Sequence, residues 1–239
     1  MSRFAFYDLD RTVTRLPTWS AFLLFAARRR APWRMALVPL ALPLFAAHAA
    51  GLLSRDRLKE LMHGLMLGRA VPADALAAVA ELFARRTAAA NIRAGARARI
   101  RADQAEGYRV VLATAAHRFY AEAIARSLGI ADVVATDAVC PPGGVLTNRL
   151  DGPNVYGPAK LAAVRRWLDA NGAARDASRV RVYSDHVSDA PLLAFADEPF
   201  AVNPHGRLRA LAGARGWPIL DWNETAARAA ATEPHACAR

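Results

Sequence analysis

The sequence predicts an α/β fold built on a parallel sheet, with a separate helical unit inserted after the first strand. That strand is expected at Arg3–Tyr7, a short aromatic-rich run that leads directly into Asp8. Residues 18–106 then show helical patterns and no strand signal. From residue 107 onward, strand patterns alternate with helical ones, which is typical of a parallel sheet covered by helices on both faces. The expected architecture is therefore a Rossmann-like three-layer α/β/α sandwich that carries a helical cap.

This order of elements divides the chain into a core, a cap and a tail. We expect residues 1–16 and 107–225 to form the α/β core, residues 17–106 the helical cap, and residues 226–239 a C-terminal tail. The chain has 239 residues, which is enough for a medium-sized core with a smaller inserted unit. Hydrophobic residues make up 54% of the chain and charged residues 22%, so the composition is that of a globular protein.

The cap is expected to be made of helices separated by clear breaks. A helix over Trp19–Arg30 ends before Pro32, because the residue that precedes a proline disfavours helical geometry. Ser54 is a good N-cap for a later helix, whose apolar positions recur at helical spacing. They form one apolar face: Leu58, Leu61, Met62, Leu65 and Met66. Two alanine-rich helices follow at Val71–Arg86 and Ala88–Ala105.

The core is expected to alternate strands and helices after residue 107. Tyr108–Ala113 is a continuous apolar run typical of a buried parallel strand. Gly129 ends the next helix, because glycine readily adopts the left-handed conformation found at helix C-termini. The further predicted strands are Asp132–Ala135, Val180–Tyr183 and Phe200–Val202, with a turn at Pro141–Gly144. The predicted helices are Phe119–Leu128, Lys160–Ala170, Asp189–Ala194 and Leu208–Gly213.

Polar side chains follow three predicted strands at their carboxyl ends, the edge at which an open parallel sheet binds ligands. One group follows the first strand, a single threonine ends the second, and another group follows the strand at residues 180–183. A lysine begins the helix between the last two. These residues are Asp8, Asp10, Thr12, Thr114, Lys160, Asp185 and Asp189. His117, just after the threonine, is expected in an exposed loop, with a contact to substrate as the alternative.

These residue types suit phosphoryl transfer. Several carboxylates at one sheet edge repel one another unless a cation compensates them, and Mg²⁺ with oxygen ligands does so beside phosphate. One carboxylate can be the nucleophile and form an aspartyl-phosphate. A second carboxylate, two residues further on, can protonate the leaving oxygen and later activate water. Lys160 and Thr114 would hold the phosphate oxygens.

The segments DLDRTVT and SDHVSD, with Thr114 and Lys160 between them, resemble the four motifs of the haloacid dehalogenase superfamily. The helical insertion after the first motif is similar to that of its phosphoserine-phosphatase-like subfamily. The resemblance implies a Mg²⁺-dependent phosphatase in which Asp8 is the nucleophile and Asp10 the general acid and base. Thr114 and Lys160 would then bind phosphate. The implied metal ligands are Asp8, the main-chain carbonyl of Asp10, and Asp185, with Thr12 and Asp189 in support.

Four positions depart from the patterns of these families. Arg11 stands where glycine, serine or asparagine is common, and His186 and Ser188 replace the more usual glycine and asparagine of the fourth motif. None of these changes removes a charged catalytic group. Pro17 occupies the place of a glutamate that helps phosphoserine phosphatases hold the amino group of their substrate. This difference counts against an amino-acid substrate.

Met35–Leu53 is a run of 19 apolar or nearly apolar residues, about the length that spans a bilayer. A single crossing conflicts with the predicted site, because Asp8 precedes the segment, its partners follow it, and all must meet on one side. Pro39 and Pro43 also favour a broken helix. We therefore expect a re-entrant or interfacial element, or a buried cap helix. The segment is similar to the cap of the bacterial phosphatidylglycerophosphatase C group.

That similarity favours a lipid phosphate such as phosphatidylglycerophosphate as the substrate. Residues 19–53 would then lie against an anionic membrane surface, at the inner face of the cytoplasmic membrane. Two alternatives stay open. One is a soluble phosphatase of a small phosphomonoester, either phosphoserine-like or a sugar phosphate. The other is a phosphotransferase that passes the phosphoryl group to an alcohol.

The net charge indicates which classes of partner to expect, and the cysteines indicate the redox state of the compartment. A net charge of +11 favours anionic partners such as phosphorylated molecules, although an arginine-rich genomic composition explains the same excess. No nucleic-acid-binding motif stands out, so we expect no nucleic acid partner. Cys140 and Cys237 lie far apart and in no metal-binding spacing, which fits a reduced cytoplasmic chain.

Overall fold

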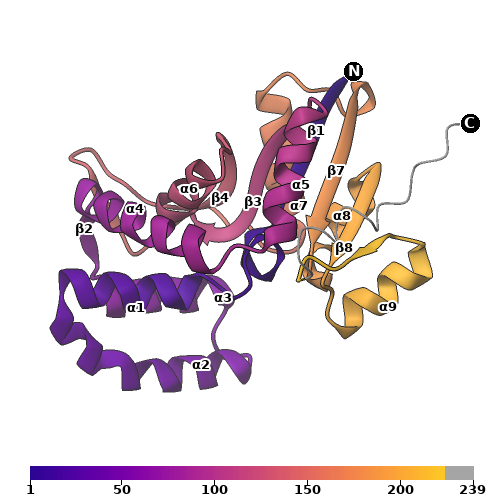
Figure 1. Cartoon of the computed structure of the whole chain (residues 1–239). Coiled ribbons are helices and arrows are strands. Elements are labelled where there is room, and N and C mark those ends of the chain that lie inside the picture. Colours follow the sequence, from indigo (N-terminus) through magenta and orange to yellow (C-terminus); the bar gives the residue numbers. More distant parts are fainter. Residues whose placement is uncertain (224–239) are drawn as a thin grey trace, which may run out of the picture.

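The computed structural model describes residues 1–223, and a seven-stranded sheet lies at its centre (Figure 1). The strand order is β6-β4-β3-β1-β7-β8-β9, with β6 antiparallel to β4 and all the other neighbours parallel. The strands are β1 (Ser2–Tyr7), β3 (Arg109–His117), β4 (Asp132–Ala138), β6 (Leu150–Asp151), β7 (Ser178–Ser184), β8 (Glu198–Val202) and β9 (Ile219–Leu220). The predicted α/β fold is confirmed.

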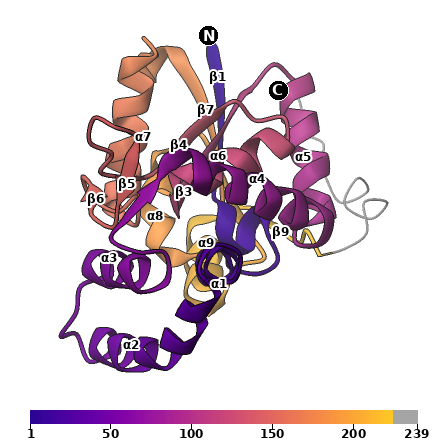
Figure 2. The same ribbon diagram turned by 90° about the vertical axis from the view of Figure 1, so that its left-hand side faces the viewer.

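Helices cover both faces of this sheet, because side chains along a strand alternate between the two faces. Ala5 and Tyr7 of β1 belong to one apolar cluster, whereas Phe4 and Phe6 belong to the other. The first cluster includes α5 (Ala94–Ala105) and α6 (Arg118–Ser127), and the second includes α7 (Pro158–Ala170), α8 (Ala190–Phe195) and α9 (Gly206–Arg215). Figure 2 shows α5 and α7 on opposite sides of the sheet. The three predicted layers are therefore present.

The register of the central strands brings their carboxyl ends to one edge. Tyr7 at the end of β1 pairs with Leu112 of β3 on one side and with Tyr183 of β7 on the other. The chain therefore leaves all three strands at the same edge, where the predicted site residues follow them. Tyr7 and Tyr183 stack at 4.4 Å between ring centroids, which packs the end of β1 firmly against β7.

The segment between β1 and β3 is almost wholly helical. Its elements are α1 (Trp19–Arg30), the 3₁₀ helix η2 (Pro32–Leu40), α2 (Ala41–Ala49), α3 (Arg55–Met66), α4 (Ala73–Ala90) and α5. In Figures 1 and 2, α2 lies farthest from the sheet, with α1 and α3 between it and the rest. By contrast, Asp103 of α5 accepts a 2.6 Å hydrogen bond from Tyr7 of the sheet. We therefore propose that the cap ends before α5, earlier than residue 106.

Three sequence expectations for this segment need correction. A short strand, β2 (Ala70–Pro72), pairs antiparallel with β5 (Val145–Thr147), although no strand was expected between residues 18 and 106. Three residues are too few to show the alternation that marks a strand. Helix α4 continues to Ala90 and α5 begins only at Ala94, because neither Gly nor Pro interrupts the chain near Arg86.

The apolar run Met35–Leu53 is divided between η2 and α2, as Pro39 and Pro43 predict. Within residues 1–223, we find no helix that is both long and apolar enough to cross a membrane. The predicted tail, residues 226–239, lies outside the described residues.

Candidate active site

Asp8 directly follows β1 and is held by Lys160 from the start of α7. The Lys160 ammonium donates to Asp8 Oδ1 at 2.7 Å and to Asp189 Oδ2 at 2.6 Å. Burial opposes the charge on Lys160, but the carboxylates of Asp189 and Asp8 outweigh it and raise the lysine pKa. Lys160 is only 3% exposed, so this cation is fixed between two carboxylates in a place that water hardly reaches.

Thr12 ties the first motif to the fourth. Its hydroxyl lies 3.2 Å from Asp8 Oδ2 and 3.0 Å from Asp185 Oδ1, and it accepts a hydrogen bond from the Asp185 backbone N–H at 3.0 Å. The Ser184 hydroxyl donates to Asp189 Oδ2 at 2.7 Å. The structure therefore brings together the ends of β1 and β7 and the start of α7, although these segments lie far apart in the sequence.

The turn after β1 places Asp10 beside the cap. Within residues 9–13, Arg11 has a φ of 64°, a left-handed conformation that side-chain-bearing residues adopt at some cost. Asp10 Oδ1 accepts two hydrogen bonds of 2.7 Å, from the backbone N–H and the hydroxyl of Thr18. Burial raises the pKa of Asp10, and the Thr18 hydrogen bonds oppose that rise. Thr18, at the start of α1, was not predicted from the sequence as a site residue.

Thr114 lies near the end of β3, two positions beyond the residue that pairs with Tyr7. Its buried hydroxyl accepts a hydrogen bond from the Ala116 backbone N–H at 3.0 Å. His117 corrects an expectation, because it is 1% exposed and not part of an exposed loop. It stacks on Phe119 at 5.1 Å between ring centroids, and burial lowers its pKa well below the usual value, so the ring is neutral.

Negative charge exceeds positive charge around Lys160. Burial raises the pKa of Asp8, and Asp189 and Asp185 add to this rise against the pull of Lys160. Asp189 Oδ1 is buried and accepts no hydrogen bond from the described residues. Three carboxylates facing one lysine are therefore incompletely compensated, which is the situation that a bound cation relieves.

The donor set fits a hard divalent cation. Among the described residues, no three His, Cys, Asp or Glu side chains are grouped in a way that could hold a metal. The predicted set requires only two side chains, Asp8 and Asp185, with a main-chain oxygen of Asp10. Both carboxylates lie within hydrogen-bonding distance of the single hydroxyl of Thr12. These oxygen donors are of the kind that Mg²⁺ prefers, with water completing its coordination.

Sequence reasoning missed Lys59, a buried lysine of cap helix α3. Its ammonium donates to the carbonyl of Ala115 and, at 2.7 Å, to Asn154 Oδ1. Burial lowers the pKa of Lys59 to about 7, and the charges of Asp10 and Asp56 oppose that change. The sequence predicted an apolar face that includes Leu61 and Leu65, yet the fully buried stripe of α3 includes Lys59 and His63 instead. The rarity of lysine in this chain was the one available signal.

Comparison with known proteins identifies the family. The family model of haloacid dehalogenase-like hydrolases matches residues 5–194. The phosphoserine phosphatase SerB1 of Mycobacterium tuberculosis is 38% identical over 116 residues, which are 48% of this chain and 37% of that protein. A histidinol-phosphatase of Neisseria meningitidis is 26% identical over 124 residues, which are 52% of this chain and 56% of that protein. The matches therefore cover less than two thirds of either relative.

A solved structure extends the likeness over almost the whole chain. A protein of unknown function from Bordetella pertussis Tohama I is 32% identical, with a TM-score of 0.84 over 93% of this chain and 99% of that one. The motifs found in the sequence, the parallel sheet that brings them to one edge, and the family match over residues 5–194 all agree. The chain belongs to the haloacid dehalogenase-like hydrolases.

Proposed function

We propose that the protein is a Mg²⁺-dependent phosphatase of phosphomonoesters that works through an aspartyl-phosphate on Asp8. The observation that carries the proposal is the set of carboxylates around Lys160 at the carboxyl edge of the sheet. Lys160 contacts Asp8 and Asp189, and Thr12 joins Asp8 to Asp185. The names of the phosphoserine and histidinol phosphatases among its relatives support the same reaction.

In the proposed mechanism, Asp8 and Asp10 divide the chemistry. A carboxylate oxygen of Asp8 attacks phosphorus, the bond to the leaving oxygen breaks, and Asp10 gives that oxygen its proton. Asp10 then takes a proton from the water that cleaves the aspartyl-phosphate, and inorganic phosphate leaves. A raised pKa suits the first of these roles, because it keeps a proton on Asp10 nearer to neutral pH.

The remaining residues would bind and neutralise the transferred group. Lys160 and Thr114 would hold phosphate oxygens, and Thr18 would orient Asp10 through its two hydrogen bonds. Mg²⁺ held by Asp8, Asp185 and the Asp10 carbonyl would supply positive charge to the phosphate oxygens. Lys160 donates to Asp8 and Asp189, and a bound phosphate would accept part of this hydrogen bonding.

Replacing the nucleophile tests the proposal directly. Asp8→Asn keeps the shape of the side chain but removes the attacking oxygen, so we expect Mg²⁺-dependent release of phosphate from p-nitrophenyl phosphate to fall by about 10³-fold or more. Removing Mg²⁺ with EDTA should abolish the wild-type activity as well. A variant that keeps more than a tenth of the wild-type rate would disprove the role of Asp8.

The substrate class can be argued from the relatives and from the surface of the cap. The relatives are named for small phosphomonoesters, which supports a small substrate of the same kind. The surface of the cap supports the alternative of a lipid phosphate substrate, because several large apolar side chains are exposed on it. Those between residues 24 and 52 are Leu24, Trp33, Leu40, Leu42, Phe45 and Leu52. An exposed apolar surface of this kind fits an interfacial element.

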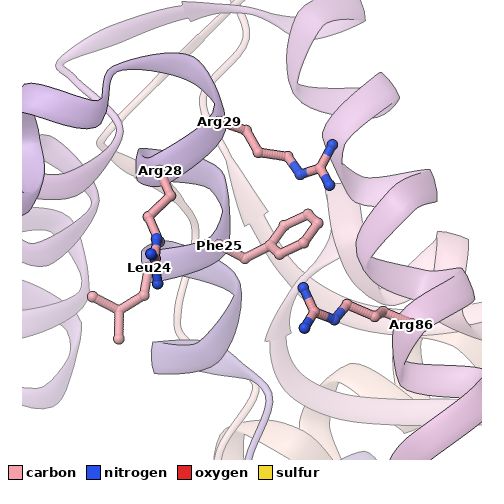
Figure 3. A pocket seen from close by; sticks show the side chains of 5 residues that line it. All are labelled: Leu24, Phe25, Arg28, Arg29 and Arg86. Atoms are coloured by element: carbon pink, nitrogen blue, oxygen red, sulfur yellow. The ribbon is translucent and has the colours of Figure 1, made fainter.

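Unpaired arginines border the apolar residues of the cap. An open hollow of about 610 Å³ is lined by Leu24, Phe25, Arg28, Arg29 and Arg86. In Figure 3, Arg29 and Arg86 lie around Phe25, and Leu24 and Arg28 lie at the left of the view. Arg29 lies 4.8 Å from the centre of the Phe25 ring. None of the three arginines makes an ion pair with any residue between 1 and 223. Guanidinium groups that lie beside apolar side chains without a carboxylate partner suit an anionic lipid surface.

Two measurements separate the substrate classes. A panel of phosphatidylglycerophosphate, lysophosphatidate, phosphoserine and sugar phosphates would show which ester is hydrolysed with the highest kcat/KM. Sedimentation with vesicles containing anionic lipid would compare the wild type with a variant in which Leu40, Leu42 and Phe45 are serine. Binding that the variant loses supports the lipid surface. Equal sedimentation of both proteins, or none at low salt, supports the small soluble substrate.

A further inference from the structure

The chain has two lysines among its 32 basic residues, and both are buried. Lys160 belongs to the site described above. Lys59 comes from the cap helix α3, is 6% exposed and reaches across to the core. Surface cations in this protein are arginines, so a lysine at position 59 is not explained by general composition. The slender stem and compact ammonium of lysine fit a narrow buried position better than the broad guanidinium group of arginine.

Lys59 contacts two segments of the core that lead to predicted phosphate ligands. Its ammonium donates to the carbonyl of Ala115, the residue after Thr114. It also donates at 2.7 Å to Asn154 Oδ1, in the segment that runs into the helix of Lys160. One cap side chain therefore contacts both the carboxyl end of β3 and the segment before α7.

Thr136 of β4 completes the connection between these two segments. Its hydroxyl lies 3.0 Å from the Ala115 carbonyl and 3.0 Å from Asn154 Oδ1, and it accepts a hydrogen bond from the Val155 backbone N–H at 3.0 Å. Thr136 is fully buried and Asn154 is 4% exposed, so these hydrogen bonds are shielded from water. Lys59 and Thr136 together hold Ala115 and Asn154 at a fixed spacing.

We propose that Lys59 is a positioning residue: by holding Ala115 and Asn154 from the cap, it sets the spacing between Thr114 and Lys160. The phosphate site then reaches its working geometry only when α3 is seated against the core. This inference rests on the proposed function, in which Thr114 and Lys160 bind the phosphate of the substrate. It assigns the cap a part in phosphate binding that is separate from any recognition of the leaving group.

The cost of burying Lys59 supports a functional role. Its two hydrogen-bond acceptors are neutral, and it makes no ion pair with any described residue. Burying a cation whose only partners are neutral oxygens costs folding free energy, and burial accordingly lowers the pKa of Lys59. An apolar residue on this face of α3 would pack with Leu58 and Met62 at lower cost. Such a cost is expected where the charge organises a site.

The test compares Lys59→Met, Thr136→Val and the double variant with the wild type in the full chain. Inhibition of p-nitrophenyl phosphate hydrolysis by inorganic phosphate measures phosphate binding, and kcat and KM are measured alongside. Each single variant should raise the phosphate inhibition constant about tenfold or more, as loss of a charge-assisted or buried hydrogen bond implies. The double variant should be little worse than either single one, because both changes release the same segments.

Arg57→Met is the matched control, because Arg57 lies on the same helix with its side chain 51% exposed. It should keep the wild-type phosphate inhibition constant within about twofold, as expected of an exposed surface position. An inactive wild type would refute the proposed function itself. An active wild type with an unchanged inhibition constant in Lys59→Met would overturn the positioning role, and so would effects that multiply in the double variant. If Lys59→Met fails to fold, Thr136→Val alone decides, and an unchanged constant there also overturns the proposal.

Discussion

Replacing Lys160 by methionine should destabilise the protein by an amount that depends on pH. The change keeps most of the apolar stem but removes the ammonium that lies 2.7 Å from Asp8 and 2.6 Å from Asp189. The two carboxylate side chains are 12% and 3% exposed, so water replaces little of the lost contact. Breaking a buried ion pair by removing one partner costs about 3–5 kcal/mol. We expect a loss of this size in the free energy of unfolding at pH 9 without metal.

Protonation should recover part of that loss. Burial raises the pKa of Asp8 to about 8 in the wild type, and the charge of Lys160 opposes this rise. Without Lys160 the pKa of Asp8 rises further, so above about pH 7 the folded variant binds more protons than the folded wild type. Extra protons on the folded state mean that the stability of the variant falls as pH rises and recovers as pH falls. Each pH unit is worth about 1.4 kcal/mol per proton. The deficit relative to the wild type should therefore be about 1.4 kcal/mol smaller at pH 6 than at pH 9.

Urea unfolding of both proteins at pH 6 and pH 9, with EDTA present, measures this difference. Arg166→Met on the same helix is the control, because Arg166 is exposed. It should change the free energy of unfolding by no more than about 0.5 kcal/mol. An equal loss at both pH values would refute the reasoning, since it would show that the carboxylates do not respond to the missing charge. A loss below about 1 kcal/mol at pH 9 would refute the buried ion pairs.

Two further predictions concern His63 and Arg11. Burial lowers the pKa of His63 from 6.5 to about 4. Below pH 6.5 the unfolded chain therefore binds more protons than the folded one, and the free energy of unfolding falls as the pH is lowered. At pH 5 this costs about 2 kcal/mol, and urea unfolding at pH 7.5 and pH 5 should show that extra loss in the wild type but not in His63→Leu. Parallel losses in both proteins would contradict it. Arg11→Gly should raise the free energy of unfolding by up to about 1 kcal/mol, because glycine adopts the φ of 64° without strain. A lower melting temperature in this variant would show that the arginine side chain stabilises the turn.

The sequence was sufficient to predict the architecture because the apolar runs along the chain all require the same kind of sheet. The aromatic strand before Asp8 and the apolar run before Thr114 required burial on both faces, which a parallel sheet covered by helices provides. The strands β2, β6 and β9 escaped prediction because they are two or three residues long. Strands of this length have no pattern of their own and form only because the rest of the fold brings their partners close.

The contacts between predicted site residues could be foreseen for one physical reason. Asp8, Thr12 and Asp185 follow neighbouring strands, so the register of the sheet alone brings them within hydrogen-bonding distance. Thr18 and Lys59 come from the cap, and no sheet register relates them to the core. Their positions depend on how α1 and α3 pack, which the spacing of residues along the sequence does not specify.

Lys59 illustrates why hydrophobic pattern alone fails at a boundary between two packed units. The pattern placed the apolar face of α3 over Leu58, Leu61, Met62, Leu65 and Met66, a set that does not include position 59. In the structure Lys59 and His63 are buried, whereas Leu61 and Leu65 are partly exposed, so the buried stripe is turned toward the charged side. A helix buries its most apolar stripe when only packing decides. The rotation observed here brings Lys59 to Ala115 and Asn154, and it leaves Leu61 and Leu65 partly exposed. This orientation is favourable only if the contacts of Lys59 contribute more to the protein than full burial of the two leucines would.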